Sequence, residues 1–222
     1  MGRNKIQNTP AIWRMPSYLH KLVLMAAVGE TYASTTVLAE YMDLDPITVR
    51  KDFALTGIIG QPGVGFRTKS LIEAIRRYLG WDMECTATLV GAGSLGSALL
   101  GHEGFLEYGL RITTVFDADP AKIGKVIHRN EIRNAKQMVS VLEHDPPSVG
   151  IICTGPECAQ EVVDTLIFLG VKAFWSFANL TLRVPDGVIV QREVIAGGFA
   201  VLSAKMKQSG LKNPEQVNTI FN

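Results

Sequence analysis

The stretch Val90-Gly91-Ala92-Gly93-Ser94-Leu95-Gly96 decides the fold that this sequence predicts. An apolar run, Thr86–Val90, leads into the glycines, and small residues that suit a helix follow them. A second apolar run, Ile112–Phe116, ends at Asp117, which stands 21 positions after Gly96. A strand, a glycine-rich turn, a helix and a later acid, in this order, are the fingerprint of a dinucleotide-binding unit.

The three glycines and the acid have separate tasks in such a unit. Gly91 permits the tight turn out of the strand, Gly93 leaves room for a pyrophosphate, and Gly96 lets the helix approach the strand. Asp117 suits a ribose 2′-OH and would repel a 2′-phosphate, which predicts NAD rather than NADP. The residues predicted to contact the cofactor are Gly91, Ala92, Gly93, Ser94, Leu95, Gly96, Asp117, Ala118, His102, Thr154 and Gly155.

The rest of the second half alternates between candidate strands and candidate helices. Strands are expected at Thr86–Val90, Ile112–Phe116, Val149–Cys153, Ala173–Phe177 and Val188–Val190. Helices are expected at Leu95–Leu100, Ala135–Glu143, Cys158–Leu169 and Gly198–Gln208. This alternation is typical of an α/β fold with a doubly wound parallel sheet of the Rossmann type.

The first part of the chain predicts short helices. Apolar residues recur at helical spacing over Tyr18–Val28, and Ser34-Thr35-Thr36 is suited to start a second helix. Asp45-Pro46 predicts a third start, with Asp as the N-cap and Pro at the first helical position. Only Asp43–Asp45 separate the second and third helices, which is the arrangement of a helix-turn-helix motif.

A glycine-rich hairpin follows the three helices and completes a winged-helix pattern. It covers Gly60–Lys69, with Arg67 and Lys69 expected on its return limb, and a further helix is expected at Ser70–Leu79. Residues 1–81 hold ten Lys or Arg against six Asp or Glu, a balance of +4, whereas the remainder has a balance of −3. A basic front part favours a polyanionic partner such as DNA.

Several classes of protein are disfavoured. The longest uncharged stretch near residue 90 is broken by glycines and polar residues, so no membrane span is predicted, and the polar N-terminus predicts no signal peptide. The three cysteines lack C-x-x-C spacing, so no metal site is expected and a reducing cytoplasm fits. None of the four histidines stands in a recognisable catalytic motif, so no enzyme is predicted.

A series of short motifs runs along about Ala11 to Lys207. The strings in the first part are Arg14-Met15-Pro16-Ser17-Tyr18-Leu19, Val49-Arg50-Lys51-Asp52-Phe53 and Gly63-Val64-Gly65-Phe66. Those in the second part are Leu89–Gly96, Gly104-Phe105, Phe116-Asp117-Ala118-Asp119-Pro120, Ile123-Gly124, Ala159-Gln160-Glu161-Val162 and Leu182-Arg183-Val184-Pro185. With these motifs in this order, the chain resembles the bacterial redox-sensing transcriptional repressors called Rex, and so many motifs make the resemblance specific.

The resemblance implies a homodimer that binds NAD(H) and an inverted-repeat operator and leaves the DNA when NADH rises. It implies a winged-helix domain at 1–82, a Rossmann domain at 83–194, and a C-terminal helix and tail at 195–222, with that helix swapped onto the partner. The residues expected to contact DNA are Ser34, Thr35, Thr48, Arg50, Lys51, Gln61, Arg67 and Lys69. Arg14, His102 and Val194 occupy the positions of an interdomain redox switch.

The chain departs from the family pattern at three positions near the cofactor. Ser94 replaces an Asn, His102 replaces the usual Tyr, and Val194 replaces the usual Asp of the switch. Glu193 would take the place of that Asp if the register slipped by one residue. The sequence therefore also supports a Rex-like regulator with a weak or altered NADH response.

Two other interpretations stay open at this point. One is a small NAD-dependent oxidoreductase with a helical accessory domain, which turnover would reveal. The other is a DNA-binding protein whose Rossmann domain serves only for dimerisation, which the absence of nucleotide uptake would reveal.

Overall fold

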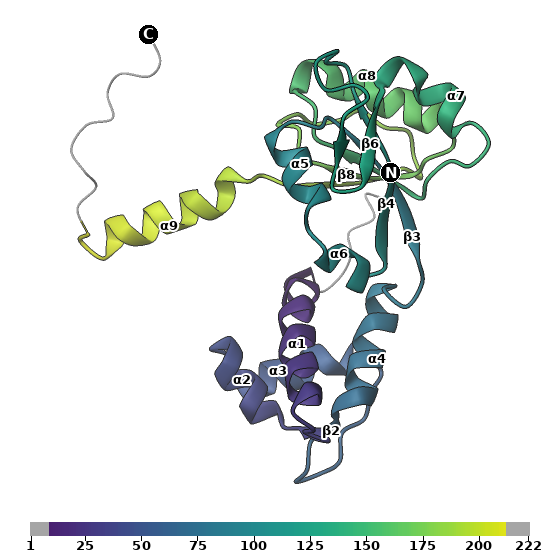
Figure 1. Ribbon diagram of the computed structural model, residues 1–222. Coiled ribbons are helices and arrows are strands. Elements are labelled where there is room, and N and C mark those ends of the chain that lie inside the picture. The colour runs from purple at the N-terminus through teal and green to yellow at the C-terminus, as the bar shows by residue number, and fades with distance from the viewer. Residues whose placement is uncertain (1–8, 212–222) are drawn as a thin grey trace. The chain divides into compact units, whose positions relative to one another are not determined.

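The computed structural model describes residues 9–211, which form two compact units (Figure 1). The first unit contains the chain up to Cys85 together with His102–Arg111. The second contains Thr86–Gly101 and the chain from Ile112 onward. The return of His102–Arg111 to the first unit is not indicated by the sequence.

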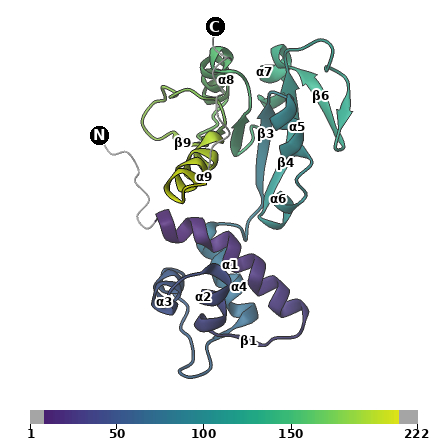
Figure 2. The same cartoon turned by 90° about the vertical axis from the view of Figure 1, so that its left-hand side faces the viewer.

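The first unit is built from four helices and a short two-stranded sheet. The helices are α1 (Thr9–Ala27), α2 (Thr35–Met42), α3 (Pro46–Ala54) and α4 (Thr68–Leu79), and β1 (Tyr32–Ala33) pairs antiparallel with β2 (Phe66–Arg67). Helices α1, α2 and α3 pack on one another (Figure 2). The predicted winged-helix fold is confirmed.

Local capping explains the helix-turn-helix. The Ser34 hydroxyl accepts a hydrogen bond from the Val37 N–H, and the Asp45 carboxylate accepts one from the Ile47 N–H at 2.6 Å. Between the two helices Asp43 adopts a left-handed conformation with φ of 53°, which ends α2. The helix starts expected at Ser34 and Asp45 are thus confirmed.

Helix α1 is longer than the sequence predicts. It begins at Thr9 rather than at Tyr18 and contains Pro16. Proline removes one backbone donor from a helix interior. The burial of Ala11 and Met15 with Tyr18 and Leu22 along one face offsets this loss.

The tip of the hairpin before β2 is a tight turn without charged residues. Val64 N–H donates to the Gln61 carbonyl at 3.1 Å across Pro62 and Gly63, and Gly63 has φ of 74°, as a type II turn requires. The return limb ends at Arg67, and Lys69 lies in the first turn of α4. The expectation that Lys69 lies on the wing was wrong, because the helix starts at Thr68, which is buried.

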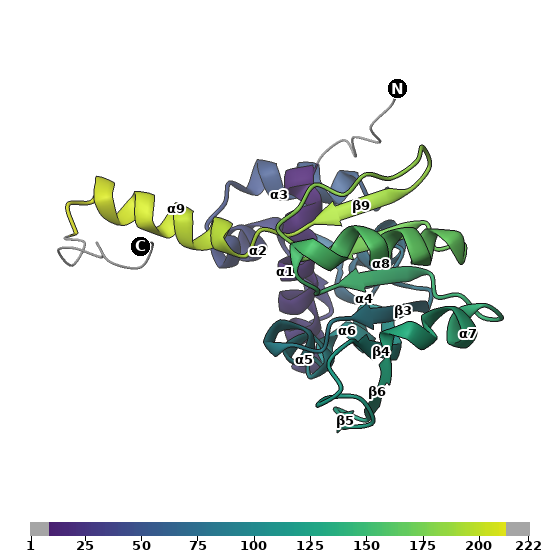
Figure 3. The ribbon, with the colours of Figure 1, turned by 90° about the horizontal axis from the view of Figure 1, so that it is seen from above.

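The second unit is a seven-stranded sheet in the order β5-β6-β4-β3-β7-β8-β9 (Figure 3). Its strands are β3 (Cys85–Val90), β4 (Leu110–Asp117), β5 (Val126–Ile127), β6 (Asn130–Asn134), β7 (Val149–Ile152), β8 (Ala173–Ser176) and β9 (Ile189–Arg192). Without β5, this is the strand order of a Rossmann fold, so the predicted fold class is confirmed. The sequence did not predict the hairpin of β5 and β6.

The helices of this unit are α5 (Ser94–Leu100), the 3-10 turn η1 (Ala135–Gln137), α7 (Met138–Leu142) and α8 (Pro156–Phe168). Side chains of α7 and α8 share one core with Val90, Phe116 and Ile152 of the central strands. The short helix α6 (Gly104–Glu107) belongs to the first unit.

Helix α9 (Ala196–Gln208) follows the last strand and buries none of its side chains within the described residues. Its large apolar side chains, Phe199 and Leu202, are 71% and 53% exposed. Among residues 9–211, no helix is long and apolar enough to cross a membrane.

Candidate nucleotide and nucleic-acid sites

Two of the three glycines in the turn after β3 are packed against backbone atoms, and the third faces open space. A Cβ at Gly91 would lie 2.7 Å from the Cys153 carbonyl group, and one at Gly96 would overlap the Gly91 carbonyl oxygen. A Cβ at Gly93 would meet nothing within 4 Å. Gly91 and Gly96 are therefore needed for packing, whereas Gly93 borders a space that a ligand can enter.

The loop after β7 borders the same space. Val90 and Ile152 are partners in neighbouring parallel strands, so Gly91 and Thr154 leave the sheet at the same edge. This edge is the point where the strand order reverses, at which open α/β sheets bind their ligands. The buried hydroxyl of Thr154 has no hydrogen-bond partner among the described residues. The open face of Gly93 and this hydroxyl fit a dinucleotide.

Asp117 has a structural task that the sequence did not predict. Its carboxylate accepts hydrogen bonds from the backbone N–H groups of Ala92 at 2.8 Å and Asp119 at 2.9 Å, and from the Lys122 ammonium at 3.0 Å. Burial disfavours its charge, but these three donors together lower the pKa of Asp117 below its ordinary value. The acid at the end of β4 thus holds the glycine turn in place, with Ala118 exposed beside it.

Replacing Asp117 with asparagine is expected to cost about 2 kcal/mol of unfolding free energy near neutral pH, because a buried charged acceptor is lost. Since the folded-state pKa is lowered, the ionised carboxylate contributes its stability above its unfolded pKa of about 4. The difference between the variant and the wild type should therefore shrink as the pH falls below about 4. Urea unfolding at several pH values measures the difference in free energy of unfolding. A difference that stays constant below pH of about 4 would contradict the stabilising role of the ionised Asp117 carboxylate.

A cysteine lies beneath the same turn but is not a reactive thiol. Burial raises the pKa of Cys153 to about 12. Because the thiolate is the form that reacts with oxidants, Cys153 remains inert at neutral pH.

The structure divides the predicted switch residues between the two units. Arg14 and His102 belong to the first unit and Val194 to the second. The His102 ring packs edge-on against Phe105, with centroids 4.6 Å apart. Val194 is 52% exposed, and the neighbouring Glu193 accepts a hydrogen bond from the Trp175 indole at 3.3 Å.

The helix-turn-helix of the first unit presents a basic face. Arg50 and Lys51 of α3 are exposed, and Thr48 is half-buried on the same helix. A groove of 540 Å³ lies between Arg50, the start of α2 with Ser34 and Thr35, and the hairpin. Its polar lining consists of Arg50, Gln61 and three hydroxyl groups, which are of the kind that contact a sugar–phosphate backbone, and the rest of its lining is glycine and apolar side chains.

The predicted wing residues are not all in this groove. Gln61 lines it at the turn of the hairpin, whereas Arg67 stands at the base of the hairpin over the Tyr32 ring, 5.8 Å from its centroid. Lys69 lies in α4. The tip of the hairpin carries Pro62 and the exposed Val64 and no charge.

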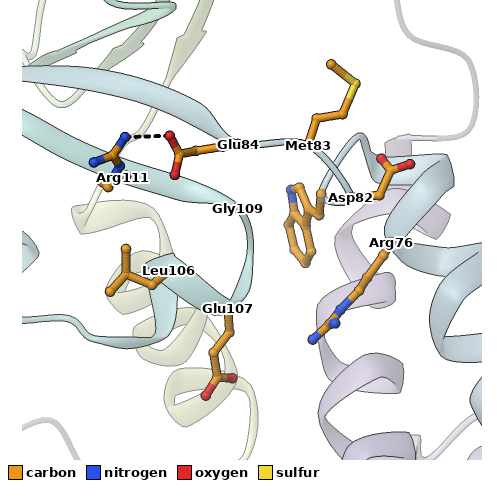
Figure 4. A pocket seen from close by; sticks show the side chains of 9 residues that line it. Arg76, Asp82, Met83, Glu84, Leu106, Glu107, Gly109 and Arg111 are labelled. Atoms are coloured by element: carbon orange, nitrogen blue, oxygen red, sulfur yellow. Dashed lines mark hydrogen bonds and ion pairs between the residues drawn. The ribbon is translucent and has the colours of Figure 1, made fainter.

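A second cavity of 340 Å³ lies between the end of α4, the chain before β3 and the segment around α6 (Figure 4). It combines Arg76 and Arg111 with Asp82, Glu84 and Glu107. Arg111 is already paired with Glu84 in an ion pair that is half exposed on both sides. This mixture of charges does not match a pyrophosphate, so the glycine turn is the better candidate for a dinucleotide site.

Comparison with known proteins identifies relatives over nearly the whole chain. Residues 9–54 match the family model described as a putative DNA-binding protein N-terminus, and residues 82–180 match that of a CoA binding domain. The chain is 42% identical over 206 residues to a redox-sensing transcriptional repressor Rex of Treponema denticola, covering 93% of this chain and 98% of that one.

Other relatives extend the likeness. Over 208 residues the chain is 33% identical to a repressor of the same description from Clostridium botulinum, covering 94% of this chain and 99% of that one. The crystal structure of RSP in complex with beta-NAD+ and operator DNA is similar, with a TM-score of 0.84, 26% identity and 94% and 96% of the two chains covered.

Proposed function

Since the chain belongs to the Rex family of redox-sensing transcriptional repressors, we propose that it is a DNA-binding repressor whose hold on its operator depends on bound NAD(H). The observation that carries this proposal is the presence, in one chain, of an exposed basic recognition helix and an open glycine turn. We propose that it is a regulator rather than an enzyme and that it acts in the cytoplasm. Within residues 9–211 no group of three or more potential metal ligands is found.

The glycine turn would hold the cofactor. Gly93 gives the pyrophosphate access to the backbone, and Thr154 supplies a hydroxyl that has no other partner. Asp117 keeps the turn fixed through Ala92 and offers its remaining acceptor capacity to the adenine ribose. The cofactor supplies a nicotinamide ring whose charge differs between its two redox forms.

We propose that the repressor acts as a homodimer through α9. Exposed apolar side chains recur at Ile195, the N-cap of this helix, and at Phe199 and Leu202 on it, a spacing that places them on one face. A second copy of the chain that receives α9 would cover this face. The proposed functional regions are 1–82, 83–194 and 195–222, except that the segment His102–Arg111 packs with the first of them. A dimer would bind an inverted repeat with one α3 in each half-site.

Redox control follows from population shift. A cofactor changes the DNA-bound fraction only if it binds the DNA-competent and the released conformations with different affinities. Arg14, His102 and Val194 are the proposed relay residues. Because two of them, His102 and Val194, differ from the family pattern, a weak response to NADH is the second candidate function.

An operator-binding titration tests the proposal. Operator duplexes are first selected from random double-stranded DNA, and the complex is then titrated with NAD+ and with NADH. Release by NADH but not by NAD+ supports a redox repressor, whereas retention with both supports the regulator with an altered response. Hydride transfer at enzymatic rates without any selected DNA would instead establish an oxidoreductase.

A further inference from the structure

A buried carboxylate joins the recognition helix to α1. Asp52 of α3 is 3% exposed and accepts hydrogen bonds from Arg14 Nε at 2.7 Å and Arg14 Nη2 at 2.8 Å. The hydroxyl of Tyr18, which is fully buried, donates a third hydrogen bond to it at 2.9 Å. All three donor atoms come from α1, so side chains of a single helix hold the Asp52 carboxylate, Arg14 with two hydrogen bonds and Tyr18 with one.

An aromatic row continues from this contact to the wing. The ring of Tyr18 meets Phe53 of α3 edge-on, with centroids 5.0 Å apart. Phe53 meets Phe66 of β2 in the same way, at 5.3 Å. Phe66 in turn packs close to Gly60, where the hairpin begins. The recognition helix therefore packs on a side chain of α1, and the base of the wing packs on the recognition helix.

The position of Asp52 on α3 links this contact to the DNA-facing residues. Asp52 follows Arg50 and Lys51 directly, and successive residues of a helix differ by about 100° around its axis. Asp52 points into the unit while Arg50 and Lys51 are exposed. A change in the rotation of α3 about its axis would move all three residues together.

Stability alone is a weak reason for such a contact. Removing a buried ion pair from water costs about as much as the pair returns, so apolar side chains of similar volume would serve stability equally well. Apolar contacts lack direction, however, whereas the fork of an arginine fixes a carboxylate in one plane. The directional part of the contact is what an apolar replacement would lose.

We propose that Asp52 is a positioning residue for DNA recognition. Arg14 and Tyr18 hold it so that α3 presents Arg50 and Lys51 at one fixed angle, and the aromatic row sets the wing relative to the same helix. This inference rests on the proposed function, since it concerns how the repressor distinguishes its operator from other DNA.

The test compares operator with unrelated duplex DNA at matched salt. Asp52→Asn is nearly isosteric, Tyr18→Phe removes one donor but keeps the ring, and Arg14→Lys keeps the charge but not the fork. Glu84→Gln is the matched control, because it breaks the exposed ion pair with Arg111 in the same unit. Thermal unfolding of each variant shows whether it is folded.

Loss of specificity without loss of general DNA affinity is the expected result. The dissociation constant for unrelated DNA divided by that for the operator should fall about tenfold for Asp52→Asn, equivalent to about 1.4 kcal/mol. The same ratio should also fall for the other two variants. Affinity for unrelated DNA and the salt slope should stay unchanged, because no phosphate contact is removed. Glu84→Gln should leave the ratio unaltered.

The opposite outcomes are equally clear. If the variants are folded and keep the wild-type ratio, the contact is only structural and the inference is wrong, while the repressor function stands. If Asp52→Asn does not fold, Tyr18→Phe and Arg14→Lys decide the question by the same ratio. If the wild type itself prefers no sequence, the proposed function fails, and the inference fails with it.

Discussion

Replacing Gly93 with valine is expected to weaken NADH binding at least about 100-fold, or about 2.7 kcal/mol, while the protein stays folded. A Cβ at Gly93 meets no atom within 4 Å and its φ of −75° is ordinary for an L-residue, so the fold has room for the side chain. The branched side chain would occupy the space through which the pyrophosphate approaches the backbone.

Fluorescence titration with NADH measures the affinity, and urea unfolding in the absence of cofactor measures the free energy of unfolding. The latter should change by no more than about 0.5 kcal/mol, as at other surface positions. Gly96→Ala is the comparison, because its Cβ would overlap the Gly91 carbonyl oxygen and is expected to cost about 3 kcal/mol. Wild-type NADH affinity in folded Gly93→Val would move the cofactor away from this turn.

Replacing Arg50 with alanine is expected to reduce operator affinity about 10- to 100-fold. Arg50 is exposed on α3 and, among residues 9–211, is the only cation that lines the groove between the recognition helix and the hairpin. If its guanidinium binds a phosphate, the loss should be equal for operator and unrelated DNA, and the salt slope should fall by about one. If it contacts a base edge, the loss should fall on the operator alone.

Arg77→Ala is the matched control for this experiment. It removes the same charge from an exposed position in the last turn of α4, well away from the groove. Electrophoretic shift or fluorescence anisotropy at two salt concentrations distinguishes the outcomes. Equal losses from Arg50→Ala and Arg77→Ala would show that general charge, rather than the groove, determines binding.

The sequence predicted those parts of the fold that depend on local chemistry. The glycine string predicted the turn after β3 because no residue with a side chain fits at Gly91 or Gly96. A Cβ at either position would collide with backbone atoms of the same unit. Asp45-Pro46 predicted the start of α3 because an N-cap and a first-turn proline act within a few residues. The alternation of strands and helices predicted a doubly wound parallel sheet, whereas the strand order is known from the structure.

Features that depend on distant contacts escaped prediction. The early start of α1 is favoured by the burial of Ala11 and by the packing of Met15 in a core drawn from all four helices, which no local signal near Pro16 reveals. The role of Asp117 depends on the Ala92 N–H, 25 positions away in sequence. The contact of Asp52 with Arg14 joins residues 38 positions apart and leaves no periodic trace.

The path of the chain between its two units has a consequence for modularity. The backbone passes from one unit to the other three times, after Cys85, Gly101 and Arg111. The Trp81 ring stacks on Tyr108 at 4.6 Å, and the Cys85 N–H donates to the Gly109 carbonyl, so the returning segment completes the first unit. A cut near residue 82 would remove His102–Arg111 from the first unit and leave this segment on the second half without its packing partners. A gene fusion at that point is therefore not expected to transfer the DNA-binding part as an independent cassette.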